Sequence, residues 1–506
     1  MALNSKKFYI TTPIYYVNDK PHIGHAYTMF AADALARYFR MRGFEVNFLT
    51  GTDENSQKNI EAAKKLGKEG DIKGYLDEMA AVWAETWDSL GMTNDDFIRT
   101  TETRHKKAIA KFIEVVWKRG DIYKGTYEGW YCVGCETFLP ESDLESGLCP
   151  IHKKPPEKIK EENYFFKLSK YRKALLNHIK KHPDFIAPES RRNEVVSYIQ
   201  NFMEDISITR ASAKCGTPFP KDKHHAIYVW FDALINYLSA VGYGADGKKF
   251  QKYWPADLHL VGKDIIKFHC ALWPAMLLSA GLPLPKKVFA HGFFTIDGEK
   301  ISKSLGNAIN PVELTSRFGV DALRYYLLRE IGFGNDGDFS PDRMSERYNA
   351  DLANGLGNLT ARILGMAEKY FGGIVPPRAT GRIAHTWLSY EVNMGSLRLD
   401  LALSDIWDAV GALDKFIDTE QPWVLAKIDK KRLSKVIYTL LESLRNIAWM
   451  VAPFLPDTAD KIFKDLGFGK TWRSSRYETA KKWGGIKPGS KVKKGAALFP
   501  RLEISH

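Results

Sequence analysis

The first fifty residues alternate between strand-like and helix-like segments, and this alternation narrows the range of possible folds more than any other feature of the chain. Residues 8–14 are β-prone, and the apolar residues from Ile23 to Met41 recur at steps of three and four, which indicates a helix. Gly43 stands where a helix C-terminal cap is expected, and residues 45–51 indicate a second strand before another helix-prone stretch. This order predicts an α/β fold built on a doubly wound parallel sheet.

The later sequence divides into regions that differ in residue composition and in the pattern of expected strands and helices. Glycine, cysteine, proline and lysine interrupt the pattern over residues 118–225, whereas strand and helix alternate again at 226–241 and 258–279. Beyond residue 342 the chain reads as helical, with one apolar stripe formed by Leu352, Leu356, Leu359, Ile363 and Met366. We therefore expect a split α/β domain (1–117 and 226–285), an inserted module (118–225), a connecting region (286–345) and an all-α domain (346–506).

Composition excludes some classes of protein and favours one kind of partner. With 44% hydrophobic and 26% charged residues, the 506-residue chain has the composition of a folded protein, and no apolar run approaches the 20 residues of a membrane span. The net charge is +13, and residues 470–503 carry ten basic side chains against two acidic ones. Such a strip suits a polyanion such as nucleic acid, although a solvated tail would look the same.

Cysteine usage points to a compartment. Five cysteines are too few for a disulfide scaffold, and the short polar N-terminus lacks an apolar signal core. We expect a reducing, cytoplasmic location.

A short motif with two histidines, residues 21–25 (Pro-His-Ile-Gly-His), lies where the first strand gives way to the first helix. In open α/β sheets, ligands collect at the carboxyl ends of strands, near helix N-termini. Gly24 would let a flat base approach the backbone, and His22 and His25 could donate hydrogen bonds to phosphate oxygens. Taken alone, such a short motif is common by chance, and ordinary helix capping is the plainer interpretation.

A second polar motif lies far along the chain, at residues 298–307 (Gly-Glu-Lys-Ile-Ser-Lys-Ser-Leu-Gly-Asn). Its two lysines, Lys300 and Lys303, and Ser302 could close over a triphosphate, with Lys303 as a mobile point charge. A solvated basic loop is the plainer interpretation of this motif taken alone.

The inserted module contains the spacing Cys132-x2-Cys135-x13-Cys149-x2-His152. Three thiolates and one imidazole fill the four tetrahedral positions of a structural Zn²⁺ and leave none open for catalysis. The alternative is a loop with free thiols. Cys215 and Cys270 have no partner at such a spacing.

Together, the histidine and lysine motifs resemble, in order and separation, the His-Ile-Gly-His and Lys-Met-Ser-Lys-Ser signatures of class I aminoacyl-tRNA synthetases, with Ile301 at the methionine position. Other stretches resemble the methionyl-tRNA synthetase family from residue 8 to residue 501; they are 11–16, 51–55, 230–237, 262–264 and 268–269. The resemblance implies a Rossmann-like catalytic domain, a zinc-knuckle insertion, a stem-contact region over 286–345 and an anticodon-binding helical domain.

The resemblance also implies a reaction. Methionine would be activated with ATP and Mg²⁺ to methionyl-adenylate and then transferred to the 3′ end of tRNA(Met), initiator tRNA included. His22, His25, Lys300 and Lys303 would be catalytic. The ATP-binding set would be these four residues together with Gly24, Gly262, Asp264 and Ser302.

The residues that the resemblance assigns to the methionine pocket are Ile14, Tyr16, Asp53, Trp230, Tyr237, Ile265, Phe268 and His269. Asp53 would hold the ammonium group, the aromatic walls suit a polarizable sulfur, and the Tyr237 hydroxyl could bond that sulfur weakly. Without the resemblance, Asp53 reads as a helix N-cap and the aromatic residues as core.

Three residues would contact the anticodon in the helical domain. Asn358 and Arg362 are four residues apart and so share a helix face, and Trp423 after Pro422 could stack on an unstacked base. Ordinary polar surface and core packing are the plainer interpretations.

Three other functions remain open at this point. They are a cytidylyltransferase-type nucleotidyltransferase, another class I synthetase such as the cysteinyl enzyme, and a non-catalytic zinc-containing tRNA-binding protein. Because the sequence stops shortly after the basic strip, we expect a monomer.

Overall fold

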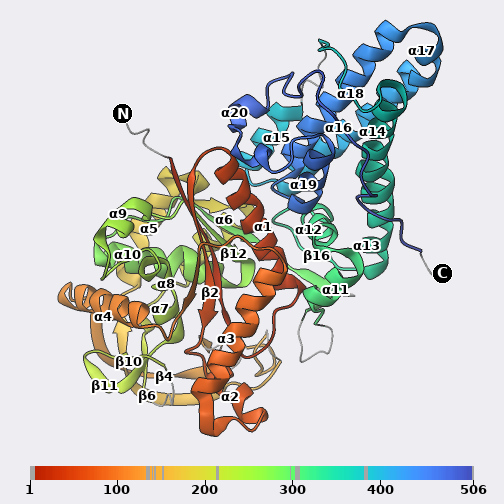
Figure 1. The fold of residues 1–506 in the computed structure, drawn as a ribbon. Helices are drawn as coiled ribbons and strands as arrows, with labels where there is room; N and C mark the ends of the chain where they lie inside the picture. Colours follow the sequence, from red (N-terminus) through yellow and green to blue (C-terminus); the bar gives the residue numbers. More distant parts are fainter. Residues whose placement is uncertain are drawn as a thin grey trace. The chain divides into compact units, whose positions relative to one another are not determined.

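The computed structural model describes residues 6–132, 137–139, 141, 144–150, 153–211, 216–296, 298–301, 308–380 and 386–503 (Figure 1). Two compact units are distinguished, and each is described by itself. Unit 1 comprises residues 1–6, 22–45 and 292–506, and unit 2 comprises residues 7–21 and 46–291. The five-segment division expected from the sequence stays a prediction.

The framework of unit 2 is a six-stranded sheet in the order β3-β2-β1-β12-β13-β7. Its strands are β1 (Lys7–Tyr16), β2 (Glu45–Asp53), β3 (Asp96–Arg99), β7 (Ile186–Ala187), β12 (Leu258–Gly262) and β13 (Val288–His291). The recorded pairings β2–β3, β1–β12, β12–β13 and β13–β7 are all parallel. The predicted parallel α/β fold is therefore confirmed, and both predicted N-terminal strands are present.

Helices accompany this sheet in unit 2. They are α2 (Gln57–Lys65), α3 (Ile72–Ser89), α4 (Thr103–Lys118), α5 (Arg172–Lys181), α6 (Glu189–Asn201), α7 (Val229–Ala233), α8 (Asn236–Ser239), α9 (Gly247–Tyr253) and α10 (Trp273–Ala280). Helix α4 packs against α8 and α10, because Ile109, Phe112, Ile113 and Val116 recur on one face and are fully buried.

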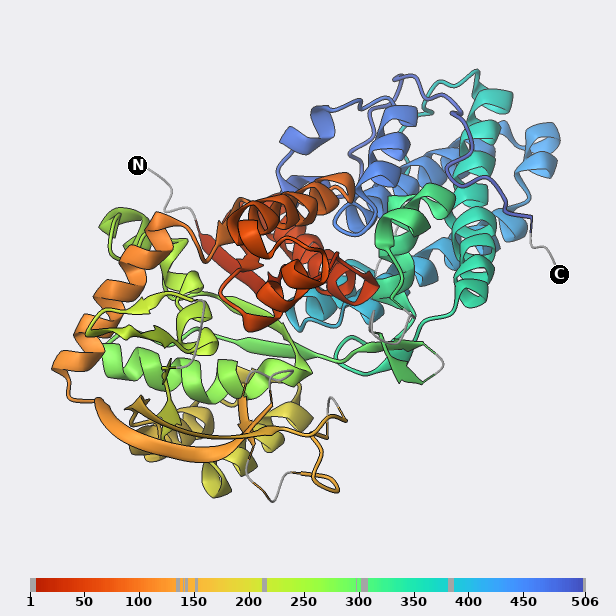
Figure 2. The same ribbon diagram turned by 90° about the horizontal axis from the view of Figure 1, so that it is seen from below.

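The inserted region consists mainly of antiparallel sheet. Strands β4 (Ile122–Cys132) and β6 (Glu157–Phe166) pair along their length and form a long, bent ribbon, orange to yellow in Figure 2. β5 (Thr137–Leu139) and β8 (Ile206–Ser207) complete this sheet, and β10 (Pro218–Phe219), β11 (Asp222–Ile227) and β9 (Thr209–Arg210) form a smaller one. Cys132 is the last residue of β4.

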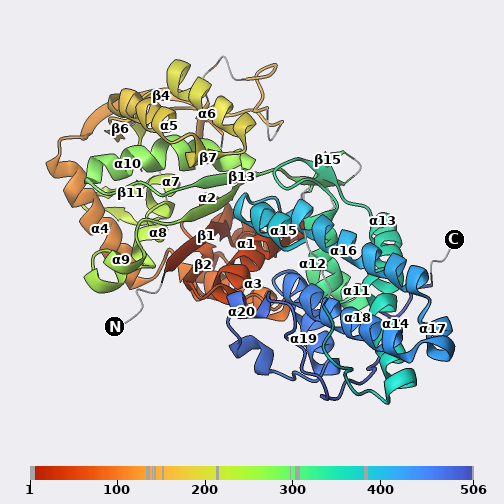
Figure 3. The ribbon, with the colours of Figure 1, turned by 90° about the horizontal axis from the view of Figure 1, so that it is seen from above.

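Unit 1 is mostly helical (Figure 3), as predicted for the C-terminal part of the chain. Its helices are α1 (Ile23–Met41), α11 (Pro311–Phe318), α12 (Val320–Arg329), α13 (Pro341–Arg347), α14 (Asn358–Phe371), α15 (Thr386–Gly395), α16 (Leu399–Glu420), α17 (Pro422–Ile428), α18 (Lys430–Val451), α19 (Pro456–Asp465) and α20 (Tyr477–Ala480). A π-helical segment, Tyr348–Gly357, precedes α14. A small sheet adds β14 (Phe294–Ile296), β15 (Glu299–Lys300) and β16 (Gly337–Asp338).

Helix α1 begins and ends where the sequence predicts, and Gly43 follows it with a left-handed φ of 79°. Its Asp33 carboxylate lies 2.8 Å from the Arg324 guanidinium of α12, with both side chains fully buried. The Arg324 Nε also donates to the Phe454 carbonyl oxygen at 2.6 Å. A buried charge pair with further hydrogen bonds thus joins α1 to the C-terminal helices.

A second buried carboxylate fixes the C-terminal segment on α18. Glu442 accepts hydrogen bonds from the backbone N–H groups of Gly484, Gly485 and Ile486 at 2.7–3.0 Å. Its two carboxylate oxygens also accept hydrogen bonds from the Arg445 guanidinium, at 2.6 and 3.0 Å. Arg445 in turn donates to the Ala480 carbonyl oxygen at 2.6 Å.

The predicted apolar stripe is largely confirmed, since Leu352, Leu356, Leu359 and Ile363 are buried and Met366 is half-buried. Within the described ranges, no helix has both the length and the apolar composition needed to cross a membrane.

Candidate active site

The two histidines of the first motif form one rigid corner at the start of α1 in unit 1. His22 is the N-cap, and its Nδ1 accepts from the Gly24 N–H at 3.1 Å, while His25 Nδ1 accepts from the His22 N–H at 3.2 Å. The rings stack with centroids 3.7 Å apart. Since Nδ1 of each ring is an acceptor, each neutral ring carries its proton on Nε2. The capping interpretation and the donor interpretation are thus compatible.

Gly24 is required by the position of the His22 ring. A Cβ at residue 24 would lie 2.9 Å from His22 Cε1 and 3.1 Å from Nδ1. This crowding is a more direct reason for the glycine than the approach of a base that the sequence suggested.

The histidine corner is hydrogen-bonded to the segment that follows the lysine motif. Ile23 N donates to the Ile309 carbonyl oxygen at 3.0 Å. At the start of the motif, β15 pairs with β14, and Asp338 Oδ1 accepts from Thr295 Oγ1 at 2.7 Å and from the Gly298 N–H at 3.1 Å. Ile301 is buried, as expected for the apolar position of the signature.

Several predicted residues of this motif cannot be placed. Lys300 lies in β15, but its side chain is outside the described part of the chain, as are Ser302 and Lys303.

In unit 2, predicted site residues end three adjacent strands. Tyr16 is the last residue of β1, Asp53 of β2 and Gly262 of β12, and parallel strands present their carboxyl ends at one edge of a sheet. Asp53 is buried and its Oδ1 accepts from the Asn55 N–H at 3.1 Å. Ser56, not Asp53, caps α2, so the helix-cap interpretation of Asp53 is excluded.

The remaining residues at this edge differ in exposure. The Lys58 ammonium lies 5.0 Å from the centre of the Tyr16 ring. Ile14 is half-buried against the core, and Asp264 is exposed just beyond β12.

Tyr237 and His269 form a buried pair. Tyr237 Oη lies 2.8 Å from His269 Nε2, and His269 Nδ1 lies 3.0 Å from the Ile265 carbonyl oxygen. Because the carbonyl can only accept, Nδ1 carries the imidazole proton and the tyrosine donates to Nε2. Burial lowers the pKa of His269 to about 4 and raises the pKa of Tyr237. The hydroxyl proton that the sequence assigned to a substrate sulfur is therefore directed at His269.

Two further aromatic residues form a wall beside this pair. The Trp230 and Phe268 rings stack with centroids 4.0 Å apart and planes within 5°, and Trp230 meets His269 edge-on at 6.3 Å. Phe268 and His269 open a π-helical turn, Phe268–Leu272, before α10. Both stacked rings are half-buried, unlike residues of a closed core.

His259 in β12 is a neighbour of this site that the motifs do not include. It is fully buried, its Nδ1 lies 2.7 Å from Thr11 Oγ1, and its ring centroid lies 4.3 Å from that of Tyr237. Burial holds the pKa of His259 well below its usual value. A histidine inside the apolar run of a central parallel strand is the sequence signal that could have found it.

The predicted metal site is only half described. Cys132 and Cys149 are buried, whereas Cys135 and His152 lie in the gaps of the described chain. Lys153 N donates to the Cys149 carbonyl oxygen at 2.8 Å, which closes a tight turn at that cysteine. Cys149 lies at this turn and Cys132 ends β4, and buried thiols in such positions suit Zn²⁺. Within the described ranges no three potential ligands cluster, and two of the four predicted ligands fall outside them.

The predicted anticodon residues are accessible to different degrees. Asn358 is exposed at the start of α14, and Trp423 is 45% exposed at the start of α17, which lies at the turn between α16 and α18 (Figure 1). The core interpretation of Trp423 is thus wrong. Arg362 is half-buried and forms ion pairs with Asp414 at 2.7 Å and Asp418 at 3.0 Å.

Comparison with known proteins gives a consistent result. The family model described as "tRNA synthetases class I (M)" matches residues 8–154 and 141–364, and "Anticodon binding domain of methionyl tRNA ligase" matches residues 382–505. The chain is 48% identical to the methionine–tRNA ligase of Thermotoga maritima, covering 98% of this chain and 80% of that protein. It is 44% identical to that of Streptomyces coelicolor, covering 99% and 97%.

Solved structures agree with these relatives. The Mycobacterium tuberculosis methionyl-tRNA synthetase in complex with methionyl-adenylate matches with a TM-score of 0.93 and 39% identity, over 98% of this chain and all of that one. The apo form of the same enzyme matches with a TM-score of 0.85.

A parallel α/β sheet, a helical C-terminal region and both signature motifs define a class I aminoacyl-tRNA synthetase. Within that class, the sequence relatives and the anticodon-domain match are specific. The chain belongs to the methionyl-tRNA synthetase family, the methionine–tRNA ligases.

Proposed function

We propose that this protein activates methionine with ATP to methionyl-adenylate and transfers the methionyl group to the 3′ end of tRNA(Met), including initiator tRNA. The main support for assigning both motifs to ATP is the hydrogen bond between Ile23 N and the Ile309 carbonyl oxygen. This bond holds the histidine corner beside the segment that follows the lysine motif.

In the proposed activation step, the methionine carboxylate attacks the α-phosphate in line and pyrophosphate leaves. No general base is required, so the rate enhancement comes from positioning the reactants and stabilising the developing charge. His22 and His25 donate from Nε2 to the phosphate oxygens as these gain charge, since both Nδ1 atoms already accept backbone N–H groups. Lys300 and Lys303 bind the departing pyrophosphate, with Gly24, Gly262, Asp264 and Ser302 as further ATP contacts. Mg²⁺, when bound, adds neutralising charge at the phosphates.

Methionine itself is assigned to unit 2. Asp53, at the carboxyl end of β2, holds the ammonium group, and Ile14, Tyr16, Trp230, Tyr237, Ile265, Phe268 and His269 surround the side chain. Because the Tyr237 proton is directed at His269, the sulfur packs against ring surfaces and edges and receives no strong hydrogen bond.

The helical domain is assigned to the anticodon. Trp423 offers an exposed ring for stacking and Asn358 an exposed amide for base edges. Arg362 would have to leave Asp414 or Asp418 in part to reach a base.

The remaining assignments concern metal, assembly and location. Cys132, Cys135, Cys149 and His152 would hold one structural Zn²⁺, which would stabilise the insertion, and metal analysis of the purified protein should give one zinc per chain. The protein is proposed to be a cytoplasmic monomer, to be checked by sedimentation and by cell fractionation.

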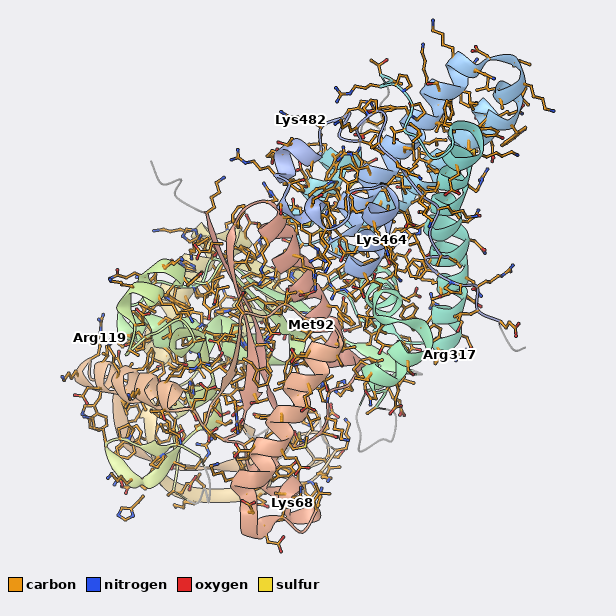
Figure 4. All side chains as sticks on the ribbon, in the orientation of Figure 1. Lys68, Met92, Arg119, Arg317, Lys464 and Lys482 are labelled. Carbon is orange, nitrogen blue, oxygen red and sulfur yellow. The ribbon has the colours of Figure 1, made fainter. Side chains whose placement is uncertain are left out.

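The test is amino-acid-dependent ATP–pyrophosphate exchange, screened across amino acids. Methionine should support it; exchange driven by cysteine would instead indicate another class I synthetase, and no adenylate with any amino acid a non-catalytic protein. Lys303→Ala should lower the exchange rate by 10²-fold or more while leaving methionine affinity nearly unchanged. Lys464→Ala, an exposed lysine of unit 1 labelled in Figure 4, is the control. Unchanged exchange in Lys303→Ala would refute the role of that lysine.

A further inference from the structure

Unit 2 contains a buried polar network that neither signature motif includes. His105 of α4 is fully buried, and its Nε2 lies 3.0 Å from Asp232 Oδ1 in α7. Its Nδ1 lies 2.9 Å from Ser239 Oγ at the end of α8. Asp232 and Ser239 are 1% and 3% exposed. Polar groups this deep are retained only where they are hydrogen-bonded, so each contact constrains its neighbours.

The direction of these hydrogen bonds follows from the outer partners. Ser239 Oγ donates to the Asn236 carbonyl oxygen at 3.1 Å. Asp232 Oδ2 accepts from Asn55 Nδ2 at 2.5 Å and from Thr217 Oγ1 at 3.1 Å. The Asp232 carboxylate accepts, so the proton on His105 Nε2 is directed at its Oδ1.

The order Ser–His–Asp does not make this a hydrolytic site. The Ser239 hydroxyl is buried and its proton goes to a backbone carbonyl. A nucleophile must be reachable by substrate and must give its proton to the base. The network is accordingly a device for holding other residues in place.

The residue that it holds is Asn55, directly after β2. The Asn55 side-chain amide donates to Asp232, as above, and also lies 3.2 Å from Thr217 Oγ1. The Asn55 backbone N–H donates to Asp53 Oδ1 at 3.1 Å. A continuous chain of hydrogen bonds thus runs from His105 through Asp232 and Asn55 to the Asp53 carboxylate.

We propose that His105, Asp232 and Asn55 are positioning residues that orient the Asp53 carboxylate for the ammonium group of methionine. This inference rests on the proposed function of Asp53. The contribution of a charged contact depends on geometry to a fraction of an ångström, and a buried chain with fixed ends supplies that constraint better than a solvated side chain. The network adds affinity for the ammonium group and none for the thioether.

The test compares two ligands that differ only in the ammonium group: methionine and its desamino analogue, 4-(methylthio)butanoate. Asp232→Asn and Asn55→Ala should each weaken methionine binding about tenfold or more, whereas analogue binding should change less than twofold. Binding is followed by tryptophan fluorescence, and the exchange assay should show the loss in KM for methionine with kcat and the KM for ATP little changed.

The matched control is Asp121→Asn. Asp121 is also a fully buried carboxylate of unit 2, and it accepts hydrogen bonds from Ser279 Oγ at 2.7 Å and from Tyr171 Oη, but no recorded bond links it to Asp53. This variant should lower thermal stability without changing the ratio of the two ligand affinities. Where Asp232→Asn does not fold, Asn55→Ala answers the question, because residue 55 is only half-buried.

The proposal would be overturned if Asp232→Asn and Asn55→Ala reduced the affinities for methionine and for the desamino analogue equally. Unchanged affinity for methionine would also overturn it. A double variant with Asp53→Asn should lose no more methionine affinity than Asp53→Asn alone; additive losses would also contradict it. Failure of the proposed function is distinguishable, because the unmodified protein would then show no methionine-dependent exchange.

Discussion

The histidines of this chain show how neighbouring groups decide what a side chain can do. In His22 and His25, backbone N–H groups occupy Nδ1 and leave the proton on Nε2. In His269, a carbonyl takes the Nδ1 proton and Nε2 accepts from Tyr237. The same imidazole therefore has its proton on Nε2 in the histidine corner and accepts at Nε2 behind the aromatic wall.

Replacement of Gly24 by alanine tests the histidine corner. The added Cβ would lie 2.9 Å from His22 Cε1, so the ring must shift and lose its bond from the Gly24 N–H. We expect the methionine-dependent exchange rate to fall about tenfold or more, while the melting temperature changes little because alanine favours a helix by up to about 1 kcal/mol.

Gly411→Ala is the matched control for that variant. Gly411 lies within α16, where an added Cβ meets no atom within 4 Å. It should raise the unfolding free energy by about 1 kcal/mol and leave exchange unchanged. A normal exchange rate in Gly24→Ala would refute the role given to the His22 ring.

The buried histidines predict a dependence of stability on pH. Burial lowers the pKa of His269 from 6.5 to about 4, so between these values the unfolded chain binds a proton that the folded chain does not. The unfolding free energy should therefore fall as pH drops from about 6.5 to 4, by up to about 3 kcal/mol from this residue. His259, whose pKa is also lowered, acts in the same direction. Urea unfolding at pH 7 and pH 5 measures the effect, and His269→Gln should show a smaller difference between the two; an equal difference would contradict it.

Individual site residues were predictable where a motif carries them. The motifs identified Trp230, Tyr237, Phe268 and His269, and the structure brings these four side chains into contact. Their hydrogen-bond directions were not predictable, because these depend on partners such as the Ile265 carbonyl oxygen. His105 is flanked by charged residues along the sequence and belongs to no motif, so its burial and its link to Asp232 are visible only in three dimensions.

At the scale of elements, the Glu442–Arg445 pair holds an irregular segment against a regular helix. Residues 480–486 contribute three backbone N–H groups and two carbonyl oxygens to this buried pair. These backbone polar groups are thereby hydrogen-bonded although the segment that carries them forms no strand or regular helix with the pair.

Glu442→Gln should be strongly destabilising. It would leave Arg445 as an uncompensated buried charge and place an amide N–H₂ against backbone donors, at about 3–5 kcal/mol of unfolding free energy. Tryptic cleavage after Lys481 and Lys482 should also become faster. Asp460→Asn, which breaks the exposed pair with Arg473, should change stability by less than about 1 kcal/mol. Equal effects of the two substitutions would contradict the role of burial.

Elements with a strong local signal were predictable, and those fixed by distant partners were not. Strands β1 and β2 and helix α1 follow the expected pattern, because periodicity and the Gly43 cap are local properties. The two-residue strand β7 exists only because it pairs with β13, which is distant in the sequence. The segment Tyr348–Gly357 is π-helical, but the spacing of its apolar residues does not distinguish a π-helix from an α-helix.

For the molecule as a whole, the uneven charge predicts salt-dependent tRNA binding. Nine of the ten basic residues between Lys470 and Arg501 are exposed, among them Lys482, labelled in Figure 4. Replacing Lys487, Lys491, Lys493 and Lys494 with glutamine removes four charges. The magnitude of the slope of log K for tRNA association against log salt concentration should fall by about 0.7–0.9 for each lost phosphate contact.

The control replaces four exposed lysines of unit 2, Lys64, Lys65, Lys106 and Lys107, and should leave the slope nearly unchanged. Equal slopes for both quadruple variants and the unmodified protein would show that the basic strip does not touch RNA.

The assignment of chain segments to the two units was beyond sequence reasoning. Periodicity places α1 between its two flanking strands, yet α1 groups with residues 292–506. Contacts between residues far apart along the chain, such as that between Asp33 and Arg324, reveal this grouping.

That grouping has a consequence during synthesis on the ribosome. Asp33 emerges early, and its partner Arg324 follows 291 residues later (324 − 33), or roughly 15 to 60 seconds at 5–20 residues per second. For this interval the first long helix is made and Arg37, one turn further along it, can pair with Asp33, but the second guanidinium on this carboxylate, that of Arg324, is absent. The nascent α1 must therefore wait for a partner helix that the ribosome has not yet translated.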